Sequence, residues 1–206
     1  LAKPPLALGK LEPVAIQIAA MTGNPAPRLK DKAVVLFAAD HHIADHGLSL
    51  TSTDVTYIQT RNFLQGGGTI NAFTRNAGAR LSVVDVGVNY DFGDLPGLVK
   101  RKVMHGANDF SRGPAMTREQ ALECLQVGID MAREEKARGL DIVAAGEMGI
   151  GNTTPSSAIV AVLTGTPVET VTGRGSGVKG EVIRKKIELI EQGIALNNPD
   201  PSDAID

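Results

Sequence analysis

Two kinds of hydrophobic pattern alternate along the chain. Short, continuously apolar runs are typical of parallel strands buried on both faces, and they cover residues 33–39, 81–88 and 141–145. A further plausible strand covers residues 99–104. Apolar residues at helical spacing predict helices over residues 11–21, 54–64, 69–76, 117–139, 156–163 and 181–196. Strands that alternate with helices predict an α/β fold with a parallel, Rossmann-like sheet flanked by helices.

The helix over residues 117–139 has the clearest local signals. Thr117 and Gln120 match a capping box, and Gly139 ends the helix. One face of this helix carries the apolar residues Ala121, Leu125, Ile129 and Ala132. This periodicity is typical of an amphipathic helix.

Composition and charge exclude several classes of protein. The 206 residues are 42% apolar, 21% charged and 3% aromatic, which fits a single globular domain over residues 1–206. Twenty-one Lys and Arg oppose 23 Asp and Glu, and the net charge of -2 indicates no nucleic-acid or anionic-lipid partner. Cys124 is the only cysteine, so an intramolecular disulfide and a thiolate metal site are excluded.

Two features concern location and the C-terminal end. The longest apolar run, Ala33 to Ala39, is far shorter than the roughly 20 residues that cross a bilayer, and residues 1–30 lack signal-peptide regions. We therefore expect a cytoplasmic protein. The turn-rich, acidic residues 197–206 resemble a linker, and we expect the natural chain to continue past them.

Parallel α/β sheets bind ligands at the carboxyl ends of their strands, which predicts a site after Ala39, Val88 and Ala145. Directly after the last of these strands comes Gly146-Glu147-Met148-Gly149-Ile150-Gly151-Asn152-Thr153-Thr154. A glycine-rich turn between a strand and a helix forms an anion site suited to a phosphate. Beside a phosphate, Glu147 would face a cationic or hydrogen-bond-donating part of the ligand. The alternative is a tight turn with a solvated glutamate.

A second glycine cluster covers residues 173–180 and includes a GxGxxG match at 175–180. A dinucleotide-binding fingerprint has to follow a strand, and residues 168–172 are too short and threonine-rich to form one with confidence. A second anion-contacting loop is the better interpretation. Arg174 and the helix cations Arg184, Lys185 and Lys186 are then available to a phosphate. For the three helix cations the alternative is a solvated face, which we expect for at least two of them.

Asp40-His41-His42, with Asp45 and His46 nearby, resembles the metal site of manganese phosphoesterases. Those enzymes need acidic and histidine ligands at an earlier strand end, and the residues before Ala33 include no histidine. We therefore expect no metal and interpret the segment as a polar active-site loop. Another polar loop with Asn108, Ser111 and Arg112 could reach the same strand edge or lie on the surface.

Motifs in order along nearly the whole chain carry a family resemblance. They are Lys3-Pro4-Pro5, Leu8-Gly9-Lys10-Leu11-Glu12, Ala39-Asp40-His41, Asn62-Phe63-Leu64 with Gly66-Gly67, Ile70-Asn71, Val84-Asp85-Val86-Gly87-Val88, Pro114-Ala115-Met116-Thr117, GEMGIGNTT at 146–154 and GRGSG at 173–177. On these motifs the chain resembles the nicotinate-nucleotide–dimethylbenzimidazole phosphoribosyltransferase family. GEMGIGNTT is the most specific of them.

The resemblance implies a Rossmann-like sheet with a smaller helical part, a homodimer, and a reaction without cofactor. In that reaction the 5-phosphoribosyl group of nicotinate mononucleotide passes to 5,6-dimethylbenzimidazole. The products are nicotinate and α-ribazole phosphate, which is the precursor of the lower ligand of cobalamin. Glu147 would stabilise the positive charge that develops on the ribose. The substrate-binding residues implied are Asp40, His41, Ser49, Gly149, Gly151, Asn152, Thr153, Arg174, Gly175, Ser176, Gly177 and Lys186.

Three departures from the family pattern matter. Leu6-Ala7 and His42 replace residues of two motifs, and Leu50 to Thr53 replace the usual tyrosine, proline and glutamine, which favours a different acceptor base. The glutamate that serves as general base in the family lies in a C-terminal part with no counterpart up to Asp206. The alternative function is therefore a non-catalytic relative or a supporting subunit.

Overall fold

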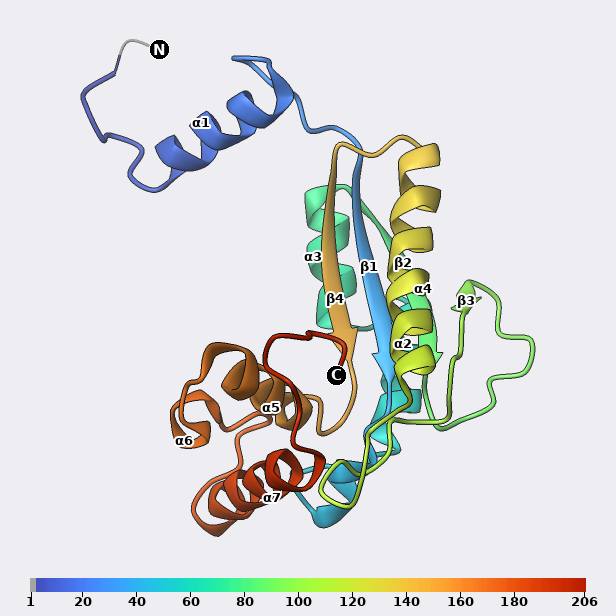
Figure 1. The fold of residues 1–206 in the computed structure, drawn as a ribbon. Coiled ribbons are helices and arrows are strands. Elements are labelled where there is room, and N and C mark those ends of the chain that lie inside the picture. Colours follow the sequence, from blue (N-terminus) through green and yellow to red (C-terminus); the bar gives the residue numbers. More distant parts are fainter. Residues whose placement is uncertain (1–2) are drawn as a thin grey trace.

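A parallel sheet of four strands, in the order β3-β2-β1-β4, forms the centre of the computed structural model, which describes residues 3–206 (Figure 1). The strands are β1 (Lys32–Ala39), β2 (Ala79–Gly87), β3 (Leu98–Lys100) and β4 (Ile142–Met148). Every strand pair is parallel. The predicted α/β class with a parallel sheet is confirmed.

Helices cover both faces of the sheet (Figure 1). On one face, α2 (Val55–Leu64) and α3 (Thr69–Ala77) pack on Leu36 and Val83 through Phe63 and Ile70. On the other, α4 (Arg118–Ala137) packs Val127 and Met131 on Val35 and Val84. Neighbouring residues of β1 and β2 therefore point to opposite cores, which explains their continuous apolar sequence.

The predicted helix α4 is present with its capping box, but its packed face differs from the apolar face named in the sequence. Leu125 and Ile129 are about half exposed, whereas Val127, Met131 and Glu135 are buried. The reason is polar: the Glu135 carboxylate accepts hydrogen bonds from Ser82 Oγ at 2.8 Å and Arg80 Nη2 at 3.0 Å. These bonds to β2, together with the apolar contacts of Val127 and Met131, hold the face with residues 127, 131 and 135 against the sheet.

Two strand predictions need correction. The run at residues 141–145 does form a strand, but β4 lies at the sheet edge, and Ile142 and Val143 are 45% and 46% exposed. Within residues 3–206 its only strand partner is β1, so here an apolar run indicated a strand without indicating burial. The strand expected at 99–104 is only three residues long, because after Lys100 the backbone bonds irregularly to β2 through the amides of Arg101 and Val103.

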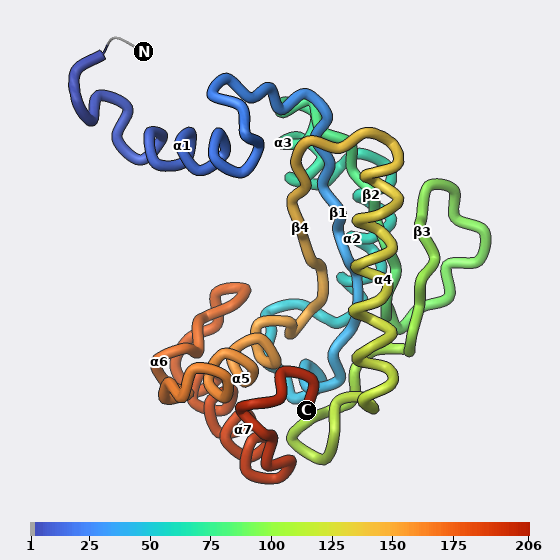
Figure 2. Tube along the Cα trace, turned by 45° about the horizontal axis from the view of Figure 1, so that its top comes forward, coloured from blue at the N-terminus to red at the C-terminus, as the bar shows by residue number. Residues whose placement is uncertain are grey.

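A smaller helical part lies beyond the carboxyl ends of the strands (Figures 1 and 2). It consists of η1 (His42–His46), α5 (Thr153–Thr164), α6 (Val168–Val171) and α7 (Glu181–Asn197). A separate core of Ile43, Leu48, Phe110, Leu189 and Ile190 holds it together. This part brings two distant segments of the sequence, η1 and α7, next to each other.

The two ends of the chain differ in their packing. Helix α1 (Leu11–Thr22) has no buried residue and lies apart from the sheet in both views (Figures 1 and 2). The C-terminal segment folds back, and Arg118 Nη1 pairs with Asp203 Oδ2 at 2.9 Å. Among residues 3–206, no helix combines the length and apolar character that a bilayer crossing requires.

Candidate functional site

The carboxyl ends of β1 and β4 meet in close contact. Ala38 pairs with Met148 in the strand register, so Asp40 and Gly149 follow at the same edge. A Cβ on Gly149 would lie 2.3 Å from the Ala39 carbonyl oxygen and 3.0 Å from His41 Nε2. Glycine is therefore required at position 149 for the loop to approach His41.

Glu147 is the last charged residue of β4 and is exposed at this edge. Its Oε1 accepts a hydrogen bond from Asn152 Nδ2, across the glycine-rich turn. One carboxylate oxygen is thus held by the protein, and the side chain remains accessible to a ligand. The Asn152 side chain makes no hydrogen bond to the first turn of α5.

Helix α5 begins at Thr153, three residues earlier than the sequence pattern indicated, and so starts within GEMGIGNTT. The Thr153 Oγ1 accepts a hydrogen bond from Lys186 Nζ at 2.7 Å, and Lys186 Nζ also donates to the Gly173 carbonyl oxygen at 3.2 Å. Lys186 is only 1% exposed. Burial lowers the pKa of its ammonium below the usual value. A buried cation therefore lies beside the uncapped N-terminus of α5.

The second glycine loop lies against the same helix end. Gly175 has φ +51°, and a Cβ there would be 2.8 Å from Thr153 Oγ1 and 3.8 Å from Lys186 Nζ. Ser176 Oγ lies 3.3 Å from Ser49 Oγ, so the segment after η1 contacts this loop. Gly177 closes the turn with a hydrogen bond from its amide to the Arg174 carbonyl oxygen at 3.0 Å.

The structure thus gathers the predicted site residues into two adjacent groups. Asp40, His41, Glu147 and Gly149 lie at the strand ends, and Thr153, Lys186, Ser49 and the 175–177 loop lie around the start of α5. Gly151 lies between them, where a Cβ would be 2.6 Å from the Cβ of Ala44 in η1.

Of the cations considered for a phosphate, only Lys186 is buried. Arg184 and Lys185 are exposed, which confirms the expected solvated face for two of the three helix cations. The Arg174 side chain is exposed as well, and within residues 3–206 it makes no hydrogen bond or ion pair. The residues before the 175–180 GxGxxG match form the short helix α6, so no strand precedes it and the dinucleotide interpretation fails.

The histidines of the Asp40-His41-His42 region point to different partners. His42 Nδ1 lies 3.1 Å from Asp45 Oδ2, and His46 Nε2 lies 2.7 Å from Asp109 Oδ2. Burial lowers the pKa of His41 below its usual value. The Asp40 carboxylate raises this pKa and the neighbouring His42 lowers it, both by less than burial does. In the described part of the chain, no three His, Cys, Asp or Glu side chains are close enough to hold a metal ion.

The polar loop after His105 does reach the strand edge. The Ala107 amide donates to the Asp40 carbonyl oxygen at 2.9 Å, and the His42 amide donates to the Ala107 carbonyl oxygen at 2.9 Å. Its polar side chains hold the loop and join it to η1: buried Ser111 donates through Oγ to Asp109 Oδ1 at 2.6 Å, and the other Asp109 oxygen pairs with His46. The loop therefore supports the candidate site through its backbone.

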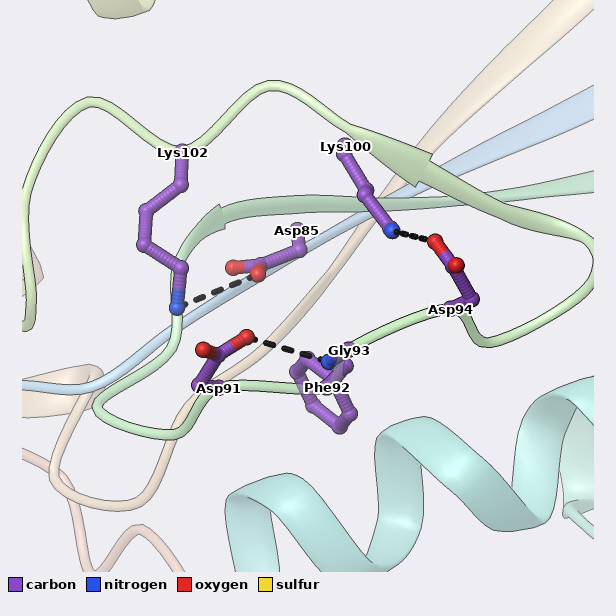
Figure 3. Close-up of a pocket in the computed structure, with 7 residues that line it drawn as sticks. All are labelled: Asp85, Asp91, Phe92, Gly93, Asp94, Lys100 and Lys102. Carbon is purple, nitrogen blue, oxygen red and sulfur yellow. Dashed lines mark hydrogen bonds and ion pairs between the residues drawn. The ribbon is translucent and has the colours of Figure 1, made fainter.

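A separate cavity of about 330 Å³ lies at the ends of β2 and β3 (Figure 3). It is lined by Asp85, Asp91, Phe92, Gly93, Asp94, Lys100 and Lys102. Its cations are already paired, Lys102 with Asp85 at 3.2 Å and Lys100 with Asp94 at 3.1 Å. Sequence reasoning assigned no role to Asp85 and Lys102, although the motif at 84–88 that contributed to the resemblance contains Asp85.

Comparisons with known proteins show the family of the chain. The model of a family described as "Phosphoribosyltransferase" (DBI_PRT) matches residues 1–206. A nicotinate-nucleotide–dimethylbenzimidazole phosphoribosyltransferase from Geobacter sulfurreducens is 52% identical over 204 residues, or 99% of this chain and 58% of that protein. The chain belongs to this phosphoribosyltransferase family.

Other members of the family give the same result. A relative of the same name from Roseiflexus sp. is 49% identical over the whole chain and 58% of its own length. The crystal structure of CobT from Thermus thermophilus superimposes with a TM-score of 0.91 at 46% identity, over 95% of this chain and 59% of that one. The chain therefore spans less than three fifths of the length of these family members.

Proposed function

We propose that this chain forms the donor-binding part of an enzyme that transfers the 5-phosphoribosyl group of nicotinate mononucleotide to 5,6-dimethylbenzimidazole or a related base. The products are α-ribazole phosphate and nicotinate, as in the synthesis of the lower ligand of cobalamin. The observation that carries the proposal is the buried Lys186 ammonium at the uncapped start of α5, beneath the Gly175 loop. Sequence similarity to the named relatives supports the choice of substrates.

The donor phosphate is assigned to the start of α5. Free N–H groups of a first helical turn and the helix dipole attract an anion, and Lys186 adds a full charge beside them. Thr153, Gly151 and the 175–177 loop then surround the phosphate. Arg174, which is exposed and unpaired within residues 3–206, is free to turn toward it.

Glu147 is assigned to the reacting carbon. When the bond between the ribose C1′ and the pyridinium nitrogen breaks, its electron pair stays on nitrogen, and positive charge develops on the ribose. A carboxylate fixed by Asn152 is suited to stabilise that charge. The acceptor nitrogen bonds to C1′ as the proton of its other ring nitrogen passes to the general base, a glutamate that the family resemblance places in the C-terminal part. Phosphate binding remote from C1′ aligns the two reactants.

The acceptor is assigned to the side of Ser49. Its hydroxyl lies 3.3 Å from both Thr51 Oγ1 and Ser176 Oγ, so short hydroxyl side chains line the approach to the 175–177 loop. Asp40 and His41 border the site at the carboxyl ends of the strands. We also propose that the protein is a cytoplasmic homodimer that acts without a cofactor.

Product formation tests the proposal. A chain ending at Asp206 is expected to bind nicotinate mononucleotide but to form α-ribazole phosphate about 100-fold to 10,000-fold more slowly than a protein of the relatives' length, because a general base contributes that factor. Chromatography of both proteins under identical conditions measures the rates. Equal rates would place the base within these residues, and no product from either protein would reject the transferase. Activity that appears only with an added active partner would favour a supporting subunit.

A further inference from the structure

Lys102 holds the turn that follows β2. Its Nζ donates to the Val88 carbonyl oxygen and, at 2.7 Å, to the Tyr90 carbonyl oxygen, and it lies 3.2 Å from Asp85 Oδ2 (Figure 3). An ammonium has three N–H donors, so these three acceptors use all of them. Both side chains of the ion pair are largely buried.

The turn held in this way presents one amide to the candidate site. Val88 is fixed twice, because its own amide donates to Asp85 Oδ1 at 2.9 Å while its carbonyl accepts from Lys102. Between Val88 and Tyr90, the Asn89 amide donates to Asp40 Oδ2 at 2.8 Å. The ion pair is therefore connected to Asp40 through a single peptide group.

Asp40 depends on that amide for its orientation. The residue is 7% exposed, and among residues 3–206 its Oδ1 is buried without a hydrogen-bond partner. The Asn89 amide is the one donor that the described residues supply to the carboxylate. Asp40 immediately precedes His41, which contacts Gly149. A shift of the Val88–Tyr90 turn would therefore move the carboxylate at the edge where Glu147 lies.

We propose that Lys102 is a positioning residue of the site, which fixes the Asn89 amide and thereby the Asp40 carboxylate. The proposal rests on the proposed function, in which Asp40 borders the reactants. Stability alone does not account for the pair, since desolvation offsets most of the attraction between buried charges. The three hydrogen-bond acceptors instead fix the position of the turn. Displacement of a group by about 1 Å at a reacting site can lower the reaction rate about 100-fold.

The test compares Lys102→Met with Lys100→Met in the complete natural protein. Lys100 is a matched control, because its ammonium pairs with exposed Asp94 and does not reach the turn (Figure 3). We expect Lys102→Met to lower kcat about 10-fold to 100-fold and to increase hydrogen exchange at residues 88–90. Lys100→Met is expected to change neither by more than about twofold.

Two further variants distinguish an effect on the position of the Asp40 carboxylate from an effect on the stability of the fold. Lys102→Met alone leaves the buried Asp85 carboxylate without its cation and should lower the thermal midpoint. Asp85→Asn/Lys102→Met removes that carboxylate as well, so the thermal midpoint should recover while kcat stays low. Lys102→Met should also have little additional effect in an Asp40→Ala background, because residues that act through one another are not additive.

Three outcomes would overturn the proposal: unchanged exchange at residues 88–90 in Lys102→Met, independent effects of Lys102→Met and Asp40→Ala on kcat, or full recovery of kcat in the Asp85→Asn double variant. Failure of the proposed function is distinguishable, because the unaltered protein would then form no α-ribazole phosphate. The exchange comparison would still decide whether Lys102 fixes the turn.

Discussion

Replacing Lys186 with methionine should weaken donor binding without weakening the fold. Methionine keeps the length and apolar stem of the side chain but removes the ammonium beside Thr153 and Gly173. A hydrogen bond to a charged group contributes about 1.5 to 3 kcal/mol, so we expect nicotinate mononucleotide to bind roughly 10-fold to 150-fold more weakly. The ammonium is buried and its pKa is lowered, so the folded protein disfavours the charge that methionine removes. The thermal midpoint should therefore hold or rise.

The assay is calorimetric titration of nicotinate mononucleotide, with inorganic phosphate as a second ligand. Lys185→Met is the matched control, because Lys185 is adjacent on α7 but exposed, with its Nζ bonded to the His46 carbonyl oxygen at 2.7 Å. The control should bind both ligands like the unaltered protein. Equal affinity in Lys186→Met, or weaker binding that appears only together with unfolding, would refute the assignment of the phosphate to α5.

Three other predictions address the chemistry and the histidines. Glu147→Gln should lower kcat about 100-fold to 1000-fold with the dissociation constant for nicotinate mononucleotide nearly unchanged, and rapid-quench kinetics that show a normal chemical step would contradict this. Burial lowers the pKa of His41 below its usual 6.5, so the unfolded chain takes up a proton more readily than the folded protein. Stability should therefore be full above pH 6.5 and fall on acidification, and thermal melts of His41→Asn should show a shallower fall. Activity should survive chelation, because His42 and His46 pair with Asp45 and Asp109; loss in a chelator with recovery in manganese would show the opposite.

The fold class, and the meeting of the candidate residues at the carboxyl ends of the strands, were accessible from sequence because both depend on local patterns. An apolar run predicts a strand wherever the strand lies, and the glycine-rich turn before α5 has a fixed place in a parallel sheet. The burial of β4 was inaccessible, because burial depends on what packs on a strand. The face of α4 was inaccessible for a related reason: the bond between Glu135 and Ser82 that helps to hold this face on the sheet joins residues 53 positions apart.

The same limit applies within the site. Residue type and helix position do not separate Arg184, Lys185 and Lys186, and only the family resemblance singled out Lys186. The packing of α7 on α5 is what buries its ammonium. The role of Lys102 was hidden because its partners are mainly backbone carbonyl oxygens, which no sequence motif records. Glu147 could be named from its neighbours, whereas its hydrogen bond to Asn152 required the geometry of the turn.

The pairing of β1 with β4 also sets the order in which the molecule can be built. Lys32 pairs with Ala79 and with Ile142, separations of 79 − 32 = 47 and 142 − 32 = 110 residues. At a synthesis rate of about 5 to 20 residues per second, β1 waits about 6 to 22 seconds for its second neighbour. During that interval His41 has no Gly149 to contact and Glu147 does not yet exist. Among the four strands described, β4 is therefore the last to be synthesised, and the edge where the reaction is assigned forms only after it. A mutation that slows the docking of β4 should reduce activity before it reduces secondary structure.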